Sequence, residues 1–205
     1  LIDHLIVSPR ANIRYNPTNN LNLRLSFSTG FRSPQAYDED FHVAVVGGER
    51  VITVLAPDLK EESSQSISAS ADYNVTIGSV QTNFTLEGFY TNLDDVFVLR
   101  QLDEPDAEGN AVLERCNGDG ARVYGMSLEA MAVLPFGMQI QAGATLQRSR
   151  YKKPEYWSED PDVPPVRNLF RTPDIYGYAT VSYKPVNPLT LALSGNFSGP
   201  MTVQH

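Results

Sequence analysis

The sequence has one cysteine, three histidines and no long apolar run, and each shortage excludes a class of protein. Cys116 is the sole cysteine, so no disulfide can form within the chain. His4, His42 and His205 lie far apart and lack the spacing of a zinc site. No segment approaches about eighteen consecutive apolar residues, which excludes a membrane-spanning helix. The formal net charge of -8 argues against a nucleic-acid partner, which requires a basic surface.

The sequence also lacks the motifs of the common catalytic and cofactor sites. It contains no nucleophile elbow, no phosphate-binding glycine loop and no pair of carboxylates with acid-base spacing. We therefore expect neither an enzyme nor a bound cofactor. Two acidic groups offer oxygen atoms to calcium, but neither has the spacing of a known calcium loop, so we interpret both as solvated loops without a metal. The groups are Asp38, Glu39, Asp40 and Asp58, and Glu155, Glu159, Asp160 and Asp162.

What the sequence does contain is a repeated alternation of apolar and polar residues. In residues 21–28, leucine and phenylalanine occupy the odd positions and polar or charged residues occupy the even ones. Successive residues of a β-strand point to opposite faces, so this pattern predicts strands with one apolar and one polar face. The run Ser66–Ile77 is about twice the usual strand length in soluble sheets. Eight candidate strands have the pattern: 11–15, 21–27, 66–77, 84–90, 124–132, 138–146, 175–183 and 189–197.

The connections between these strands alternate between short and long. Compact stretches rich in turn-forming residues suit hairpins and lie at 16–20, 78–79, 134–137 and 185–188. Connections well beyond the usual loop length lie at 31–60, 102–120 and 151–171. Short turns at one end of a sheet and long loops at the other are typical of outer-membrane barrels. The sequence therefore predicts an all-β fold, an antiparallel up-and-down meander of about eight long strands.

Two of the long connections contain further strand patterns. In the first, His42–Val46 and Arg50–Leu55 flank two glycines that favour a hairpin turn. In the second, Val96–Leu99 and Ala111–Glu114 lie on either side of residues 106–110. We expect each pair to form a small ribbon, and the second ribbon to extend the neighbouring strands beyond the main sheet.

The aromatic residues favour a membrane setting for this meander. Most of them lie near predicted strand ends, where amphipathic rings sit at a membrane interface. Leucine and alanine dominate the apolar positions between them. Two alternatives stay open. A soluble β-sandwich, acting as a carbohydrate-binding or adhesive module, also alternates, although its strands are shorter and its connections cross between sheets. A passive porin has the same barrel architecture.

Short motifs, in order along nearly the whole chain, resemble the barrel of TonB-dependent outer-membrane receptors. The best match is Ser28–Pro34, which reads S-x-G-F-R-x-P. Gly88–Phe97 is similar to the family's F-x-T-x-I-x-D-x-I strand, and Tyr124–Glu129 to its G-x-E strand. Weaker counterparts are Ser8–Tyr15, Leu59–Ser66, Arg171–Pro173 and Ser198–Met201.

The resemblance implies that residues 1–205 are an arc of a large transmembrane β-barrel in the bacterial outer membrane. Such barrels usually have about 22 strands and a plugged lumen, so the chain would supply roughly a third of the wall, without the plug domain and the terminal strands. The long loops would face outward. The implied partners are outer-membrane lipid, the plug, the TonB energy-coupling protein and a scarce nutrient such as a siderophore, haem, a vitamin or a glycan.

An isolated arc has two unpaired edge strands and one apolar face, and both promote association. We therefore expect the isolated chain to self-associate through an edge or through that face. If it is ordered alone, we expect a curled antiparallel sheet or a closed small barrel that buries its apolar set. That set is Leu21, Leu23, Leu25, Ile67, Leu86, Leu128, Ile140, Leu191 and Leu193.

The alternation assigns polar side chains to the lumen, and the long loops supply the candidates for ligand contact. The lumen-facing set is Arg24, Ser26, Ser68, Ser70, Asp72, Thr85, Glu87, Ser127, Glu129, Gln139, Gln141 and Thr145. Arginine and aromatic side chains dominate recognition of polar or anionic ligands. The ligand-binding candidates are therefore Arg32, Tyr37, Arg50, Arg100, Arg115, Arg122, Tyr156, Trp157 and Arg167.

Overall fold

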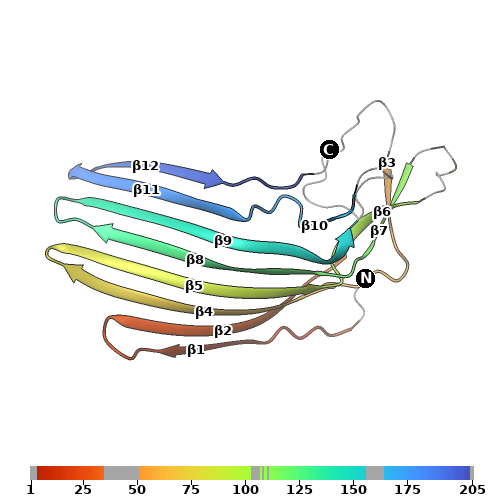
Figure 1. The fold of residues 1–205 in the computed structure, drawn as a ribbon, viewed down its shortest axis with the longest axis horizontal. Helices are drawn as coiled ribbons and strands as arrows, with labels where there is room; N and C mark the ends of the chain where they lie inside the picture. The colour runs from red at the N-terminus through yellow and green to blue at the C-terminus, as the bar shows by residue number, and fades with distance from the viewer. Residues whose placement is uncertain are drawn as a thin grey trace.

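The eight strands predicted from the sequence form one antiparallel meander in the computed structural model of the chain (Figure 1). The structure describes residues 4–34, 51–102, 107, 109, 111–155 and 164–203. All of the elements of regular secondary structure among these residues are β-strands. In this part of the chain, no helix is long and apolar enough to cross a membrane. The strands of the meander are β1 (Arg10–Tyr15), β2 (Leu21–Arg32), β4 (Glu62–Ile77), β5 (Val80–Asp94), β8 (Ala121–Val133), β9 (Met138–Glu155), β11 (Ile175–Val186) and β12 (Leu189–Ser198).

The order of the strands across the sheet is β1-β2-β4-β5-β8-β9-β11-β12, so the chain moves steadily from one edge to the other. Every pair of neighbours is antiparallel. A meander in one layer has none of the crossings between two sheets that define a sandwich. The predicted fold class is therefore confirmed.

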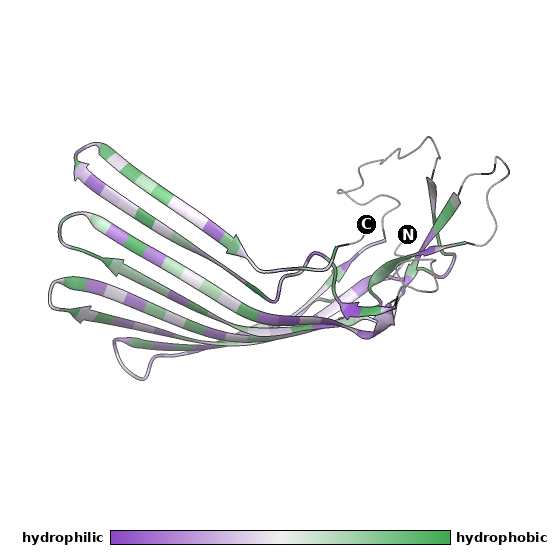
Figure 2. Ribbon diagram, turned by 45° about the horizontal axis from the view of Figure 1, so that its top comes forward, coloured by the Kyte–Doolittle hydropathy of each residue, from purple (hydrophilic) through white to green (hydrophobic). Residues whose placement is uncertain are grey.

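The register aligns residues of like polarity across the sheet. Cross-strand partners in an antiparallel pair point to the same face, so each row of partners belongs to one face. One row is Leu23, Ala71, Leu86, Leu128 and Ala144, and the adjacent row is Arg24, Ser70, Glu87, Ser127 and Thr145. Figure 2 shows the resulting alternation of hydrophobic and hydrophilic bands along the strands. The sheet thus has an apolar face and a polar face.

Short turns join the strands at one end of the meander, on the left of Figure 1. The turn between β4 and β5 contains two residues, because Ile77 pairs with Val80. Gly78 has a φ of 61°, which glycine adopts readily and which a two-residue hairpin favours. Between β1 and β2, the Thr18 hydroxyl accepts a hydrogen bond from the backbone N–H of Leu21 at 3.1 Å. These local contacts set the register of the hairpins.

At the other end, the strands extend further into the long connections than the sequence pattern predicts. β9 continues to Glu155, so residues 151–155, expected in a loop, are strand. The pairing of β11 with β9 ends at Leu146, and beyond it β10 (Val166–Asn168) lies along β9. β2 likewise continues to Arg32, inside the predicted connection 31–60. The apolar alternation fades toward these ends while the backbone pairing continues, so the sequence pattern placed the boundaries too early.

The apolar face of the meander is exposed in the single chain. Leu86, Leu128 and Leu193 are 49%, 54% and 77% exposed. The predicted burial is therefore wrong for the single chain: within the predicted set Leu21 is partly buried and the other members are exposed. The reason is that the described strands of the meander form a single layer, and no other described part of the chain packs against its apolar face. A protein with this face requires apolar surroundings.

Candidate functional site

A second, smaller sheet lies at the long-connection end of the meander, on the right of Figure 1. It consists of β3 (Val51–Leu55), β6 (Phe97–Gln101) and β7 (Ala111–Asn117), in the order β3-β7-β6. β6 and β7 are antiparallel, which confirms the ribbon predicted in the second connection. This ribbon belongs to the small sheet, and Asp95, with a φ of 55°, separates β6 from β5.

Of the ribbon predicted in the first connection, the structure describes only the second strand, which contains β3. Residues 42–46 lie outside the described part of the chain. The described partner of β3 is β7, and the two strands are parallel, with Ile52 opposite Val112. Parallel pairing links the first long connection to the second, although the two segments lie about sixty residues apart. The small sheet therefore joins two of the three long connections into one structure.

Phe97, at the start of β6, is the centre of a polar cluster between the two sheets. The guanidinium carbon atoms of Arg32 and Arg115 lie 5.5 and 5.9 Å from the centre of its ring, within the range of cation–π attraction. Glu62 accepts a hydrogen bond from the Phe97 N–H, and its other carboxylate oxygen lies 3.6 Å from Arg32. Arg115 is only 3% exposed. This cluster fixes the small sheet to β2 and β4.

Asn117, the last residue of β7, joins the first two connections by its side chain. Its Nδ2 donates to the carbonyl of Lys60 at 3.0 Å and to that of Asp95 at 2.7 Å. Its Oδ1 accepts from the N–H of Lys60 at 2.8 Å. Two residues further along the chain, Asp119 forms an ion pair with Lys153 of β9 at 2.7 Å. Polar side-chain contacts therefore join the long connections to one another and to β9 at this end of the meander, which we call the mouth of the arc.

The structure places five of the nine sequence-predicted ligand contacts, and it does not bring all five together. Arg32 and Arg115 meet at Phe97, and burial removes Arg115 from the surface that a ligand reaches. Arg100 is exposed on β6, opposite Glu114. Arg122 and Arg167 are exposed on β8 and β10. The other four, Tyr37, Arg50, Tyr156 and Trp157, lie outside the described residues.

Sequence reasoning missed three residues that build the mouth: Glu62, Phe97 and Asn117. Phe97 stands in the family-like motif Gly88–Phe97 and in the predicted ribbon strand Val96–Leu99, but neither pattern indicates its arginine partners. Glu62 stands in the weaker family-like motif Leu59–Ser66, and Asn117 has no local signal. The partners of both come from other connections, so the sequence does not indicate these contacts.

The polar face of the meander carries a network of short side-chain hydrogen bonds between neighbouring strands. Ser127 and Thr145 share a hydrogen bond of 2.9 Å, and Thr85 donates to Asp72 at 2.9 Å. Ser66 and Thr91 make another of 2.9 Å. These bonds lie between strands of the meander, and the polar face has the hydrogen-bonding groups of a hydrated or protein-contacting surface.

Acidic residues are concentrated in the sequence of the long connections. Of the 24 Asp and Glu residues in the sequence, 17 lie in the connections 33–61, 95–120 and 156–174, together with 6 of the 16 Lys and Arg residues. In the described residues, no group of three or more His, Cys, Asp or Glu side chains is arranged to hold a metal ion.

Glu61 and Cys116 are among the titratable groups near the mouth that have shifted pKa values. A hydrogen bond from its own backbone, assisted by His4 at 3.1 Å, lowers the pKa of the Glu61 carboxyl. Burial raises the pKa of the Cys116 thiol. Cys116 is 8% exposed, so it is a poor nucleophile and packs as a small apolar residue.

A comparison with protein families decides the identity of this arc. Residues 3–203 match the family model described as "TonB dependent receptor-like, beta-barrel". The chain belongs to the TonB-dependent receptor family. It is thus a part of a receptor barrel of the bacterial outer membrane, and the soluble β-sandwich is not favoured. None of the curated proteins compared with this chain matches it.

Solved structures of outer-membrane receptors have the same fold as this TonB-dependent receptor chain. The siderophore receptor PirA from Pseudomonas aeruginosa matches with a TM-score of 0.62 and 14% identity, over 93% of this chain and 34% of PirA. The FrpB iron transporter from Neisseria meningitidis (F3-3 variant) matches with a TM-score of 0.58 and 18% identity, over 93% of this chain and 26% of FrpB.

A mutant of the ferric enterobactin receptor PfeA from Pseudomonas aeruginosa, in complex with enterobactin, matches with a TM-score of 0.59 and 14% identity. The match covers 94% of this chain and 28% of PfeA. The chain therefore spans about a third or less of the length of these three proteins. At these identities the likeness concerns the fold alone.

Proposed function

We propose that this chain is the barrel wall and the outward loops of a receptor that takes up a scarce nutrient with energy supplied through TonB. The observation that carries the proposal is the two-faced meander: an exposed apolar face suits lipid, and a hydrogen-bonded polar face suits a lumen. The small sheet built from two long connections adds an ordered structure at the mouth, where a nutrient arrives.

The polar face is the surface that we assign to an internal partner, a plug domain in the lumen. A row such as Arg24, Ser70, Glu87, Ser127 and Thr145 presents charged and hydroxyl groups to the lumen. We assign these groups to contacts with a plug domain and with water. The apolar face is assigned to outer-membrane lipid. An isolated copy of the chain lacks both partners, so it self-associates through an edge strand or through this face.

The mouth supplies the nutrient contacts. We assign ligand contact to Arg32, Arg100 and Arg167, with Tyr37, Arg50, Tyr156 and Trp157 from the rest of the connections. Arg122, also predicted as a ligand contact, is not assigned to the nutrient, because its position on β8 places it on the apolar face with Tyr124. Arg115 is assigned a structural role instead, because it is 3% exposed. The names of the similar structures include iron, a siderophore and enterobactin, so metal ions and metal chelates are the first class to test, before haem, vitamins and glycans.

The decisive experiment is uptake of radioactive iron, supplied as free ferric iron and as ferric enterobactin, by cells that contain the full-length receptor. We expect uptake of at least one form to fall to background when the receptor gene is deleted, and to return on complementation. We also expect it to fall when TonB is deleted. Uptake that needs the receptor but persists without TonB would identify a passive porin. Iron uptake that does not depend on the receptor would contradict the assignment to metals and direct the same test to haem, vitamins and glycans.

A further inference from the structure

Four cationic side chains form a patch on the apolar face, on the mouth side of its aromatic residues. Arg122 of β8 is the cross-strand partner of Arg150 of β9, and Arg148 is the partner of Tyr124. Lys152 follows Arg150 by two residues, so it belongs to the same face. Arg122 and Arg148 are exposed. These four residues are the cationic patch.

The cationic patch is only partly neutralised. Asp174 lies 3.7 Å from Arg148 and 3.4 Å from Arg150, and Asp94 pairs with Lys152. Among the described residues, no carboxylate lies within ion-pair distance of Arg122. Two carboxylates against four cations leave two positive charges in excess on a chain whose net charge is -8. The patch is therefore a local exception to the charge of the chain and is suited to an anion.

Aromatic rings mark the boundary between the cationic patch and the apolar surface. Tyr90 and Tyr124 are cross-strand partners whose rings are stacked, with centroids 6.4 Å apart. Both point to the apolar face, and tyrosine favours the level of lipid headgroups in a membrane. Because Arg148 is directly opposite Tyr124, the patch begins at that level. Its height on the wall is therefore the height of lipid phosphates.

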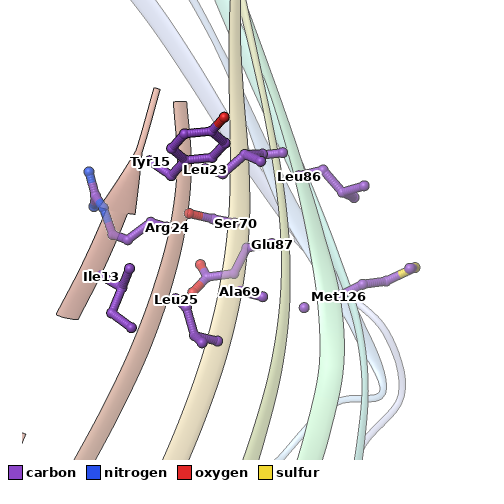
Figure 3. Close-up of a pocket in the computed structure, with 12 residues that line it drawn as sticks. Ile13, Tyr15, Leu23, Arg24, Leu25, Ala69, Ser70, Leu86, Glu87 and Met126 are labelled. Atoms are coloured by element: carbon purple, nitrogen blue, oxygen red, sulfur yellow. The ribbon is translucent and has the colours of Figure 1, made fainter. Parts of the chain in front are cut away.

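An apolar groove lies below the tyrosine pair on the same face (Figure 3). It has a volume of about 620 Å³, and small residues, Ala69, Ala71 and Gly88, form its floor between larger neighbours. Figure 3 shows Leu86 and Met126 on one side of the strands, with Arg24, Ser70 and Glu87 pointing to the other. The side-chain walls of the groove are Ile13, Tyr15, Leu23, Leu25, Leu86 and Met126.

The groove and the cationic patch are spaced as the two parts of one lipid. Met126 in the groove and Arg122 in the patch are four residues apart on β8, which corresponds to about 13 Å along the strand. Gly88 and Asn92 have the same spacing on the neighbouring strand β5, and Asn92 pairs with Arg122. A lipid with its phosphate at Arg122 and Arg150 therefore has acyl chains that extend down the wall and reach the groove.

We propose that the cationic patch and the groove together form a binding site on the outer wall for a phosphate-bearing lipid of the outer leaflet. The guanidinium groups of Arg122, Arg148 and Arg150 bind the phosphate, since guanidinium forks match phosphate oxygens. The groove binds an acyl chain. The inference rests on the proposed orientation, in which the apolar face meets lipid and the long connections lie outside. Such a lipid fixes β8 and β9 at a defined height.

The test measures lipid binding to the full-length receptor, folded in detergent, by native mass spectrometry. The probe is dimyristoyl phosphatidic acid. Its matched controls are glycerol 3-phosphate, which has no acyl chains, and dimyristoyl glycerol, which has no phosphate. We expect the phosphatidic acid to remain bound and both controls to bind at least about tenfold more weakly, because each lacks one half of the interaction. Equal binding of glycerol 3-phosphate, or of dimyristoyl glycerol, would overturn the two-part site.

Variants localise the binding. We expect the double variant Arg122→Gln with Arg150→Gln to weaken phosphatidic acid binding about tenfold. Gly88→Leu fills the groove and is expected to weaken it similarly. A Cβ atom added at Gly88 meets no atom within 4 Å, so the substitution causes no clash with the backbone, and heat-modifiable migration on gels verifies that the variant folds. Arg14→Gln, an arginine of the opposite face, is the control and should leave binding unchanged. Unchanged binding in either patch or groove variant would contradict the site. The assay contains neither nutrient nor TonB, so its outcome is independent of the uptake experiment.

Discussion

Leu128 and Glu129 are adjacent residues of β8 that offer a matched test of the two faces. Both are exposed in the single chain, Leu128 by 54%, and they point to opposite sides of the sheet. Leu128→Arg places a charge on the apolar face, and Glu129→Arg places the same charge on the polar face. In water the two substitutions would have similar, small effects, within about 0.5 kcal/mol.

In a membrane the two substitutions separate. From Val133, the end of β8, to Leu128 the strand advances by about 17 Å. At a strand tilt of about 40°, this is about 13 Å along the membrane normal, close to the middle of an apolar band roughly 25 Å tall. Arginine at that depth on the lipid face costs about 2–4 kcal/mol. We therefore expect Leu128→Arg to lower the free energy of unfolding by about 2–4 kcal/mol and Glu129→Arg to change it by less than about 1 kcal/mol.

The assay is equilibrium unfolding of the full-length receptor in lipid vesicles with guanidinium chloride, monitored by tryptophan fluorescence. The control is the wild-type protein in the same vesicles, with heat-modifiable migration on gels to verify that each variant folds. Equal effects of the two substitutions would refute the assignment of faces. A larger cost for Glu129→Arg would reverse it.

Three further predictions concern the mouth and the wall. Arg115→Ala should weaken the small sheet by about 2 kcal/mol, because it removes the desolvated contact with Phe97. Hydrogen exchange of the β6 and β7 amides should therefore accelerate about 30-fold. Unchanged exchange would contradict the contact. Gly125→Val should prevent folding or destabilise the barrel strongly, because a Cβ atom there meets the backbone of β9 at 2.3 Å. Gly195→Val should be neutral, because a Cβ atom there meets nothing within 4 Å. Unfolding in vesicles distinguishes the two variants. Burial raises the pKa of Cys116, so its alkylation in the folded receptor should stay slow until the pH exceeds the ordinary thiol pKa. The stability that the buried neutral thiol contributes should be complete below the ordinary thiol pKa and lost as the pH rises through the raised pKa of the folded state. Rapid labelling at neutral pH would show that the thiol is accessible.

The meander itself was predictable because its signal is local. The alternation in Ser66–Ile77 determines the faces of β4, and the compact turn after it sets the register with β5. Repetition of this pattern then determines the row that joins Arg24, Ser70 and Glu87. The motif Ser28–Pro34 is also contiguous, so the resemblance to the family is visible in the sequence alone.

The mouth was predictable only in part, because its contacts join distant segments. The β6–β7 ribbon follows from neighbouring patterns, but no local signal links β3 to β7 in parallel. Arg115 has the sequence features of a ligand contact and is instead buried at Phe97, a contact that only the fold creates. Arg122 and Arg150 likewise become partners only when the register of β8 and β9 is known.

The most direct test of the central claim, that one face of this sheet meets lipid and the other a lumen, is a nitroxide scan along β8. Single nitroxide labels are placed at positions 126, 127, 128 and 129 of the full-length receptor, in which Cys116 and any cysteine outside this chain are replaced by alanine. The labels are compared in lipid vesicles for collision with oxygen, which dissolves in lipid, and with a water-soluble nickel chelate. The account predicts that labels at Met126 and Leu128 are the more accessible to oxygen, and that those at Ser127 and Glu129 are not. Accessibility without a period of two, or with the opposite phase, would contradict it.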